Sequence, residues 1–253
     1  MKTLITIFSI IIFSLPAFSD TENIEQQLKN ANQLYAQDQF EEAIKQYEQI
    51  ISENYTSPTL FFNTANAYYR LNEIGKAIYY YEKAKMLIPN NDDINYNLEL
   101  AKLRVKNLPP EVPEIFPVRL FRQITFWKSY PFWGILSLGL FILFLLTAYF
   151  YFTAKTSRVK KIRLLSAVFV LFFSISAFVF MQYQLSILNA HNQAIVISKE
   201  DMAKSSPDTG ANDLFKVYQG YKVKVNSENG EWYEITLTDG RKAWLKKEDL
   251  KVL

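Results

Sequence analysis

The chain has 253 residues, of which 49% are hydrophobic and 21% are charged, and its formal net charge is only +3. This near balance of charges excludes a polycation that coats nucleic acid, so we expect no nucleic-acid partner. Cysteine is absent and histidine occurs once, at His191. Disulfides, thiol nucleophiles and Cys- or His-cluster metal sites are therefore excluded, and we expect no cofactor and no metal.

A short apolar segment opens the chain. Lys2 precedes an apolar run over residues 4–15, and the small residues Ala17 and Ser19 follow it. This order is typical of a signal peptide, which we predict over residues 1–19, with the mature chain starting outside the cytoplasm. The run is short for a membrane span of about 20 residues. An uncleaved N-terminal anchor is the alternative.

The next part of the chain contains an internal repeat. Ala31 and Ala43 recur 34 residues later as Ala65 and Ala77. This period, with small residues and aromatics at fixed offsets, is the tetratricopeptide (TPR) signature. We predict an all-α TPR solenoid over residues 20–107, in which the alanines let paired helices approach closely.

Other positions refine the repeat. We expect Tyr47 and Tyr81 to fill the space between neighbouring repeats, and Pro89 to end the second helical hairpin. The second copy matches the signature better than the first. A partial third unit around residues 96–101 is predicted to cap the stack, because the end of a solenoid needs its apolar face covered.

TPR arrays bind peptides or protein segments on the concave face formed by the first helix of each pair. The register predicts eight side chains on that face, several of them recurring with the 34-residue period. They are Asn32, Tyr35, Phe62, Asn66, Tyr69, Arg70, Tyr96 and Arg104. The alternative is that they are merely exposed polar and aromatic helix residues. As a binding surface, they would hold another protein.

Two long apolar stretches follow a proline-rich spacer, which we place at residues 108–130. We predict transmembrane helices at 131–153 and 164–186, joined by a loop over 154–163. Buried core helices are the alternative, which two Phe-, Leu- and Ile-rich stretches in tandem disfavour. The four prolines of the spacer favour a stiff extended segment over an SH3 or WW ligand.

The loop between the spans is basic. Five of the nine residues from Lys155 to Arg163 are Lys or Arg and none is acidic. Short basic loops stay cytoplasmic, so both flanking domains are predicted on the outer, periplasmic side of the inner membrane, which agrees with the signal peptide. Ahead of the first span, residues 118–127 mix apolar and basic side chains. We expect them in the interface, with Trp127, Tyr130 and Trp133 at headgroup depth and membrane lipid as a partner.

After the second span the pattern changes to short alternating strands. We predict a small all-β barrel over residues 192–253, closed by a turn at 227–230 and by a hairpin turn at Asp239-Gly240. Its strands are expected at residues 194–197, 221–225, 231–237, 241–245 and 250–253.

The glycine and tryptophan positions of this region resemble bacterial SH3 (SH3b) domains. Gly220, Trp232, Gly240 and Trp244 carry the resemblance, and Ala243 departs from it where many relatives have Gly. The resemblance implies binding of cell-wall peptides or protein segments. The candidate surface is Tyr218, Tyr221, Trp232, Tyr233 and Trp244. Alternatively, Trp232 and Trp244 belong to the barrel core or rim.

The order of the parts carries a further resemblance. A signal peptide, two TPR repeats, a proline spacer, two spans with a basic connection and a terminal SH3b domain together resemble the BatE family of the Bacteroides aerotolerance (Bat) group. The resemblance covers the whole chain. It implies partners among membrane proteins with von Willebrand factor A domains, a MoxR-type ATPase in the same system, and a role as an adaptor. No catalytic residue is implied.

We do not expect an enzyme. His191 is the one imidazole base, and it lies where the second span meets the outer domain. Neighbouring carboxylates, such as Glu41 with Glu42, point in different directions on a helix. Two functions remain. One is a membrane-anchored periplasmic adaptor that acts through its TPR face, in a Bat-type complex linked to aerotolerance or envelope stress. The other is an envelope sensor or peptidoglycan-binding protein that acts through the SH3b domain.

Overall fold

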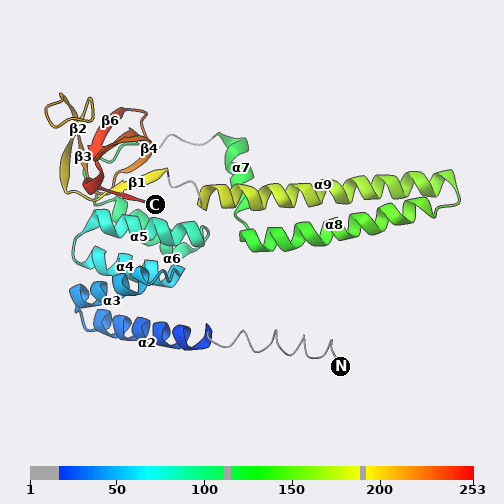
Figure 1. Ribbon diagram of the computed structural model, residues 1–253, viewed down its shortest axis with the longest axis horizontal. Helices are drawn as coiled ribbons and strands as arrows, with labels where there is room; N and C mark the ends of the chain where they lie inside the picture. The colour runs from blue at the N-terminus through cyan, green and yellow to red at the C-terminus, as the bar shows by residue number, and fades with distance from the viewer. Residues whose placement is uncertain (1–16, 111–114, 189–191) are drawn as a thin grey trace. The chain divides into compact units, whose positions relative to one another are not determined.

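The computed structural model describes residues 17–110, 115–188 and 192–253 (Figure 1). Most of the predicted signal peptide lies outside the described residues, as do Pro113 and His191. The described chain forms two compact units. The repeat–sheet unit comprises residues 17–87, 91–110 and 194–253, and the hairpin unit comprises 88–90, 115–188 and 192–193. Segments before and after the two apolar helices therefore belong to the same unit.

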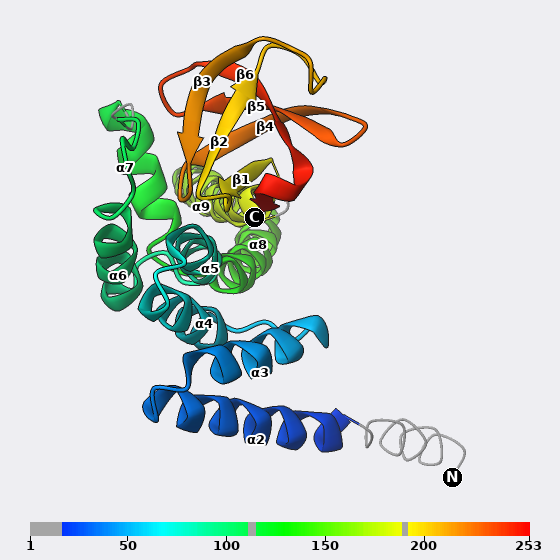
Figure 2. The same ribbon diagram turned by 90° about the vertical axis from the view of Figure 1, so that its left-hand side faces the viewer.

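The N-terminal half of the repeat–sheet unit is helical. Its helices follow one another as a stack (Figure 2). They are α2 (Ala17–Ala36), α3 (Phe40–Ser52), α4 (Pro58–Arg70), α5 (Ile74–Leu87) and α6 (Asp92–Lys102). The pairs α2/α3 and α4/α5 are the two predicted repeats, and α6 is the predicted partial third unit.

Local sequence explains where these helices start and turn. The Ser57 hydroxyl accepts a hydrogen bond from the Leu60 amide at 3.1 Å, and Pro58 follows at the first helical position. Inside each repeat, the connection between helices contains one left-handed residue. Asp38 (φ 59°) and Asn72 (φ 62°) occupy the same position of the 34-residue period. Asn and Asp tolerate this conformation better than most residues.

The packing confirms the register of the repeat. Ala43 and Ala77 are fully buried, as expected where two helices approach closely, and Tyr47 and Tyr81 are buried between neighbouring helices. The α4 positions that pack on α5 include Ala65. Its counterpart in α6 is Glu99, which pairs with Lys102 at 3.1 Å. This side of α6 therefore carries charges, which is what the prediction of a capping helix requires.

The C-terminal part of the unit is a seven-stranded sheet in the order β3-β2-β6-β5-β4-β1-β7. The strands are β1 (Gln193–Val196), β2 (Glu200–Lys204), β3 (Asp213–Tyr218), β4 (Lys222–Asn229), β5 (Trp232–Leu237), β6 (Lys242–Lys246) and β7 (Leu250–Val252). As predicted, the segment at 194–197 pairs with the others: Ala194 is antiparallel to Val252. A one-turn helix, η1 (Lys247–Asp249), precedes β7.

Two features of the sheet differ from the sequence analysis. Strands β2 and β3 were not predicted, and the turn placed at 227–230 is shorter, because β4 continues through Ser227 to Asn229 after a bulge. Gly230, with φ 57°, then makes the turn. Acidic β2 lacks strand propensity. It is held by pairing with β3, where Lys204 and Asp213 form an ion pair at 2.5 Å.

The hairpin unit contains α7 (Phe116–Thr125), α8 (Tyr130–Phe152) and α9 (Ser157–Leu188). Helices α8 and α9 are long and apolar enough to cross a membrane. They are joined by exchanged hydrogen bonds: the Ser137 hydroxyl donates to the Ser174 carbonyl and the Ser174 hydroxyl to the Ser137 carbonyl, both at 2.9 Å. Each hydroxyl thus finds an acceptor inside the pair.

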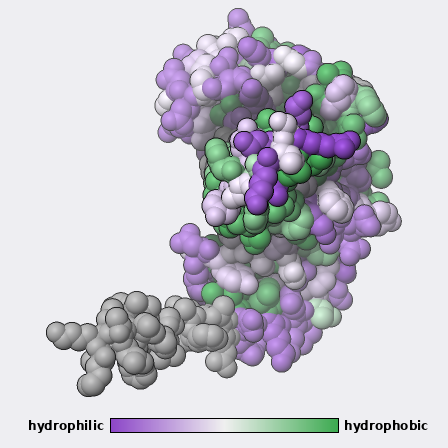
Figure 3. All heavy atoms as spheres, turned by 90° about the vertical axis from the view of Figure 1, so that its right-hand side faces the viewer, coloured by the Kyte–Doolittle hydropathy of each residue, from purple (hydrophilic) through white to green (hydrophobic). Residues whose placement is uncertain are grey.

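The basic segment between the spans is mostly helical. Helix α9 begins at Ser157, so Arg158 to Arg163 form its first turns rather than a loop, and only residues 153–156 connect the helices. Figure 3 looks along the hairpin toward this connection, and hydrophilic side chains lie there in front of the hydrophobic flanks of the two helices.

Candidate functional site

On the predicted binding face, the same tyrosine–asparagine hydrogen bond occurs in each of the two repeats. The Tyr47 hydroxyl donates to Asn32 Oδ1 at 2.7 Å, and the Tyr81 hydroxyl donates to Asn66 Oδ1 at 2.5 Å. Burial is the main reason why the pKa of both tyrosines lies above its usual range. Since the carbonyl end of each amide is engaged inside the repeat, Asn32 and Asn66 are held in fixed orientations along this face. Asn63 adds a bond to Asn32 Oδ1 at 2.9 Å.

The two predicted arginine anchors make contacts between successive repeats. Arg70 donates to Asp38 at 3.0 Å and lies over the Phe40 ring at 4.4 Å. Arg104 donates to Asn72 at 2.7 Å, and its guanidinium lies over Tyr69 at 4.9 Å. Each arginine thus contacts the left-handed turn residue of the preceding repeat. Both are exposed, yet removing them would also loosen the stack.

The predicted aromatic residues differ in how much surface they offer. Tyr35 packs against Phe40 with ring centroids 5.3 Å apart, and Phe62 lies 5.9 Å from Tyr81. Tyr96, on α6, is 66% exposed. Of the predicted aromatic side chains on this face, Tyr96 therefore depends least on contacts inside the stack.

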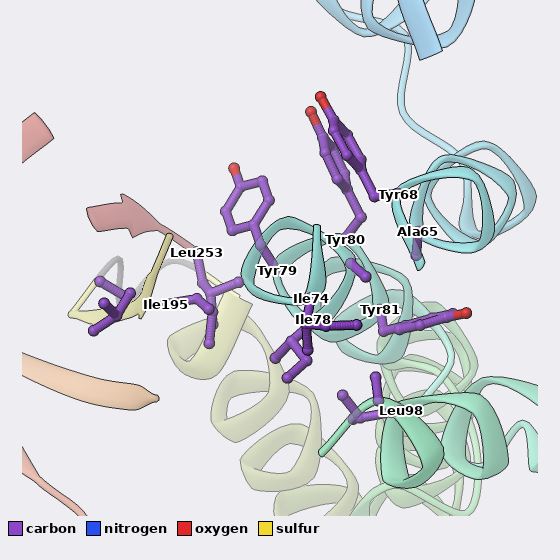
Figure 4. Packing of buried hydrophobic residues seen from close by; sticks show 14 of the residues in the cluster. Ala65, Tyr68, Ile74, Ile78, Tyr79, Tyr80, Tyr81, Leu98, Ile195 and Leu253 are labelled. Atoms are coloured by element: carbon purple, nitrogen blue, oxygen red, sulfur yellow. The ribbon is translucent and has the colours of Figure 1, made fainter. Parts of the chain in front are cut away.

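A joint between α5 and the sheet was not predicted from the sequence. Figure 4 shows α5 with Tyr68 and Ala65 of α4 on one side, Leu98 of α6 on another, and Ile195 and Leu253 of the sheet on a third. These side chains belong to one continuous core. The TPR and SH3b regions, which the sequence suggests are separate domains, share that core although two apolar helices separate them along the chain.

Two glycines make the close approach of the joint possible. A Cβ atom on Gly75 would stand 2.7 Å from the Val196 carbonyl oxygen, and one on Gly220 would stand 2.6 Å from Val105 and 2.7 Å from Ile78. The Gly75 amide also donates to the Gln219 side chain at 3.2 Å. Side chains at either glycine would hold α5 and the sheet apart.

Charged and polar groups complete the joint. Lys222 of β4 pairs with Glu82 of α5 at 2.8 Å, and the Glu82 side chain is almost fully buried. Lys251 of β7 lies over the rings of Tyr79 and Tyr80 at 5.3 and 5.4 Å. Burial lowers the pKa of Lys251, and Lys76 and Lys83 lower it further, whereas Glu48 raises it. These pairs satisfy the charges that docking removes from water.

The five residues predicted for the sheet surface differ in exposure. Tyr221 was expected to meet a ligand, but it is 3% exposed and its hydroxyl donates to the Asn107 carbonyl inside the joint. The remaining predicted residues, Tyr218, Trp232, Tyr233 and Trp244, are partly exposed. Lys106 lies over Tyr218 at 4.8 Å and Lys247 over Tyr233 at 5.0 Å.

One carboxylate pair in the sheet has an unusual environment. Asp249 is partly buried, and burial together with the charge and hydrogen bond of Asp201 raises its pKa to about 6. Asp249 lies in η1, and its carbonyl accepts the Ile197 amide at 2.8 Å. Within the part of the chain that the structure describes, no group of three or more His, Cys, Asp or Glu side chains is placed to hold a metal ion.

Two family models match the chain. Residues 204–251 match the bacterial SH3 domain, and residues 58–91 match the tetratricopeptide repeat. The second match covers α4, α5 and the turn after them, which is the stronger of the two predicted copies. The curated proteins compared with this chain gave no match. TPR and SH3b domains are typically non-catalytic, and together they support a scaffold or adaptor role.

Proposed function

We propose that this protein is a membrane-anchored adaptor that holds another envelope protein on the face formed by α2, α4 and α6. The observation that carries the proposal is the pair of bonds from Tyr47 to Asn32 and from Tyr81 to Asn66. They fix similar amides 34 residues apart along one surface. Regularly spaced amides and aromatic rings suit an extended protein segment, because they offer hydrogen bonds and apolar contacts at a constant repeat.

The joint supports the proposed topology. Residues before α8 and after α9 share one core, which supports a topology in which both ends of the hairpin emerge on the same side of the membrane. The basic start of α9 favours the cytoplasm for the connection between the spans. We therefore propose that the repeat–sheet unit lies in the periplasm, anchored to the inner membrane by α8 and α9 and preceded by a signal peptide over residues 1–19.

Single cysteines test this topology, since the natural chain has none. A cysteine at Ser157 should resist a membrane-impermeant thiol reagent in intact spheroplasts, whereas cysteines at Ser52 and Ser227 should react. Reaction at Ser157 together with protection at both other positions would reverse the orientation.

The resemblance to the BatE family suggests which partner to look for. Under this proposal the bound protein is a membrane protein with a von Willebrand factor A domain, in a Bat-type complex linked to aerotolerance or envelope stress. The order of TPR repeats, apolar helix pair and SH3 domain supports this choice.

Site-specific crosslinking tests the binding face. A photo-crosslinking amino acid at Tyr96 samples that face, and the same amino acid at Lys45, exposed on the opposite side of the stack in α3, is the matched control. We expect one membrane protein to be captured from position 96 and not from position 45, and the capture to decrease with Tyr69→Ala. Equal capture at both positions would contradict the proposal.

A second candidate function rests on the match to the bacterial SH3 domain. Such domains bind peptidoglycan in many envelope proteins, and Tyr233 with Lys247 is an exposed aromatic and cationic pair on this sheet. Because the sheet shares its core with α5, binding to purified cell wall should be measured on the intact chain. Loss of wall binding in Tyr233→Ala, with capture at position 96 retained, would favour this function.

A further inference from the structure

Helix α7 is fixed to the open end of the hairpin. The Thr125 carbonyl at its end accepts hydrogen bonds from Trp133 Nε1 at 2.8 Å and from Gln184 Nε2 at 2.6 Å. Gln184 also donates to the Lys128 carbonyl at 2.8 Å. Trp133 belongs to the first turn of α8 and Gln184 lies near the end of α9. These bonds hold the end of α7 at the level where both spans end.

One apolar side of α7 packs against α9, and a second side makes no ring contact with it. Phe121 packs against Phe180 and Tyr183 of α9, with ring centroids 5.6 and 5.2 Å apart. Phe116, Leu120 and Ile124 follow one another at intervals of four residues, and all three are exposed. Because α7 is fastened to both apolar helices, a membrane around α8 and α9 would lie next to α7 and could receive this exposed apolar side.

The charges of this segment are of one sign. Residues 115–130 contain Arg119, Arg122 and Lys128 and no acidic residue, and the two acidic residues of the spacer, Glu111 and Glu114, precede them. Arg119 and Arg122 are exposed and, at three residues apart, lie on the same side of α7, where the Arg119 guanidinium lies 6.0 Å from the centre of the Phe116 ring. Exposed Trp127 and Tyr130 accompany them. Aromatic and basic side chains around an apolar stripe are the composition of a helix that lies at a membrane surface.

We propose that α7 lies in the membrane–water interface with Phe116, Leu120 and Ile124 in the lipid, and that Arg119 and Arg122 bind the phosphate groups of anionic phospholipids. Guanidinium groups bind phosphate oxygens in bidentate fashion, which makes them suited to such headgroups. The site is separate from the adaptor face, and its function does not depend on a protein partner. It would fix the depth and tilt of the hairpin in the membrane.

A local fluorescence measurement tests the proposal. The full chain carrying Leu120→Cys is labelled with a fluorophore and inserted into vesicles of phosphatidylcholine and phosphatidylglycerol, one of which is brominated and quenches the label. We expect quenching by both lipids and stronger quenching by brominated phosphatidylglycerol. Arg119→Gln with Arg122→Gln should reduce this preference about five-fold or more, since one cation near an anionic surface contributes about that factor. Added salt should weaken the preference in the parent chain.

The control removes the same charge elsewhere. Lys224→Gln with Lys242→Gln changes two exposed lysines of the sheet and should leave the preference unchanged. Three results would overturn the proposal. Absence of quenching by either lipid would mean that protein covers this side of α7. Equal quenching by both lipids would mean that headgroup charge is not recognised. A preference that survives removal of both arginines would mean that they do not bind the headgroup.

Discussion

Helices α3 and α5 occupy the same place in two consecutive repeats, yet their outer sides have opposite roles. Glu41 and Lys45 of α3 are exposed, whereas Gly75 and Tyr79, which stand 34 residues further on, are buried. The shared positions Ala43 and Ala77 are buried in both. The inner sides of the two helices therefore preserve the repeat, and the outer side of α5 has become a docking surface for the sheet.

A glutamate that occurs at the same repeat position in both helices makes different contacts in each. Glu48 in α3 accepts hydrogen bonds from the hydroxyls of Tyr68 and Tyr80, at 2.6 and 3.0 Å. Its counterpart Glu82 pairs with Lys222 of the sheet. A comparison of repeats thus separates what the TPR fold requires from what this particular molecule adds to it. The added part is a joint that ties segments on both sides of the hairpin.

The largest effect is expected when Gly75 of α5 is replaced by glutamate, the residue that α3 has at the equivalent position 41. Gly75→Glu would place a side chain 2.7 Å from the Val196 carbonyl and a charge in the core of the joint. We expect a loss of about 3 kcal/mol or more in the free energy of unfolding, and separate unfolding of helices and sheet. Urea unfolding followed by circular dichroism and by tryptophan fluorescence measures this.

The reciprocal change is its control. Glu41→Gly removes a side chain from the exposed surface of α3, so it should cost only about 1 kcal/mol through the low helix propensity of glycine. If Gly75→Glu leaves a single transition at an unchanged midpoint, α5 and the sheet are not joined as described.

The opposite side of the joint allows a matched pair of glycine substitutions. Gly220 and Gly240 both have φ +89°, but a Cβ on Gly220 meets Val105 and Ile78, whereas one on Gly240 has nothing within 4 Å. Alanine at either position strains the backbone equally. Gly220→Ala should therefore cost roughly 1–3 kcal/mol more than Gly240→Ala, through overpacking alone. Equal melting temperatures for the two variants would show that the sheet does not press on α5.

Periodic features could be predicted from the sequence alone, whereas features that depend on assembly could not. The repeat register, the two apolar helices and most strands could be inferred, because Ala43, Ala77 and the alternating strand residues obey simple periods. The joint could not, since no local pattern says that residues 75 and 220 meet. A signal was present nevertheless. Gly75 stands where the first repeat has Glu41, and a glycine inside a helix, where it costs stability, usually has a reason.

The binding face shows the same limit. The period placed Tyr69, Arg70 and Arg104 on one surface, but not the contacts by which the arginines connect successive repeats. Those contacts depend on the left-handed residues Asp38 and Asn72. Tyr221 was expected on the surface from the resemblance to SH3b domains, but it is buried and its hydroxyl donates to the carbonyl of Asn107, in the segment after α6.

A smaller effect tests what the two repeats have in common. Tyr47→Phe and Tyr81→Phe each remove one hydroxyl that donates to an asparagine. Each should cost about 1 kcal/mol, the usual net value of such a bond, with the two values close to each other. Thermal unfolding of both variants measures this. A much larger cost for Tyr81→Phe alone would mean that its hydrogen bond also supports the joint.

The smallest effect concerns Asp249, in the sheet that packs against α5 and not against α3. Asp249 has a pKa of about 6 in the folded chain, against 3.8 for an unperturbed aspartate. The folded state thus binds more protons between these values, so the stability from this group is present at low pH and declines as pH rises toward 6. Asp249→Asn removes a charge that burial penalises and that Asp201 repels, so it should raise the melting temperature near pH 7.5. Because Asp249 is partly exposed, we expect less than about 1 kcal/mol.

The pH dependence distinguishes this cause from a general change in charge. The advantage of Asp249→Asn over the parent chain should shrink as pH falls to about 4.5, where the carboxyl of the parent binds a proton. Asp201→Asn should reproduce only part of this behaviour, because it removes the repulsion between the two carboxyls but leaves Asp249 partly buried. An advantage that stays constant across this range would show that the titration of Asp249 is not its cause. No effect of Asp201→Asn at any pH in this range would show that the two carboxyls do not interact.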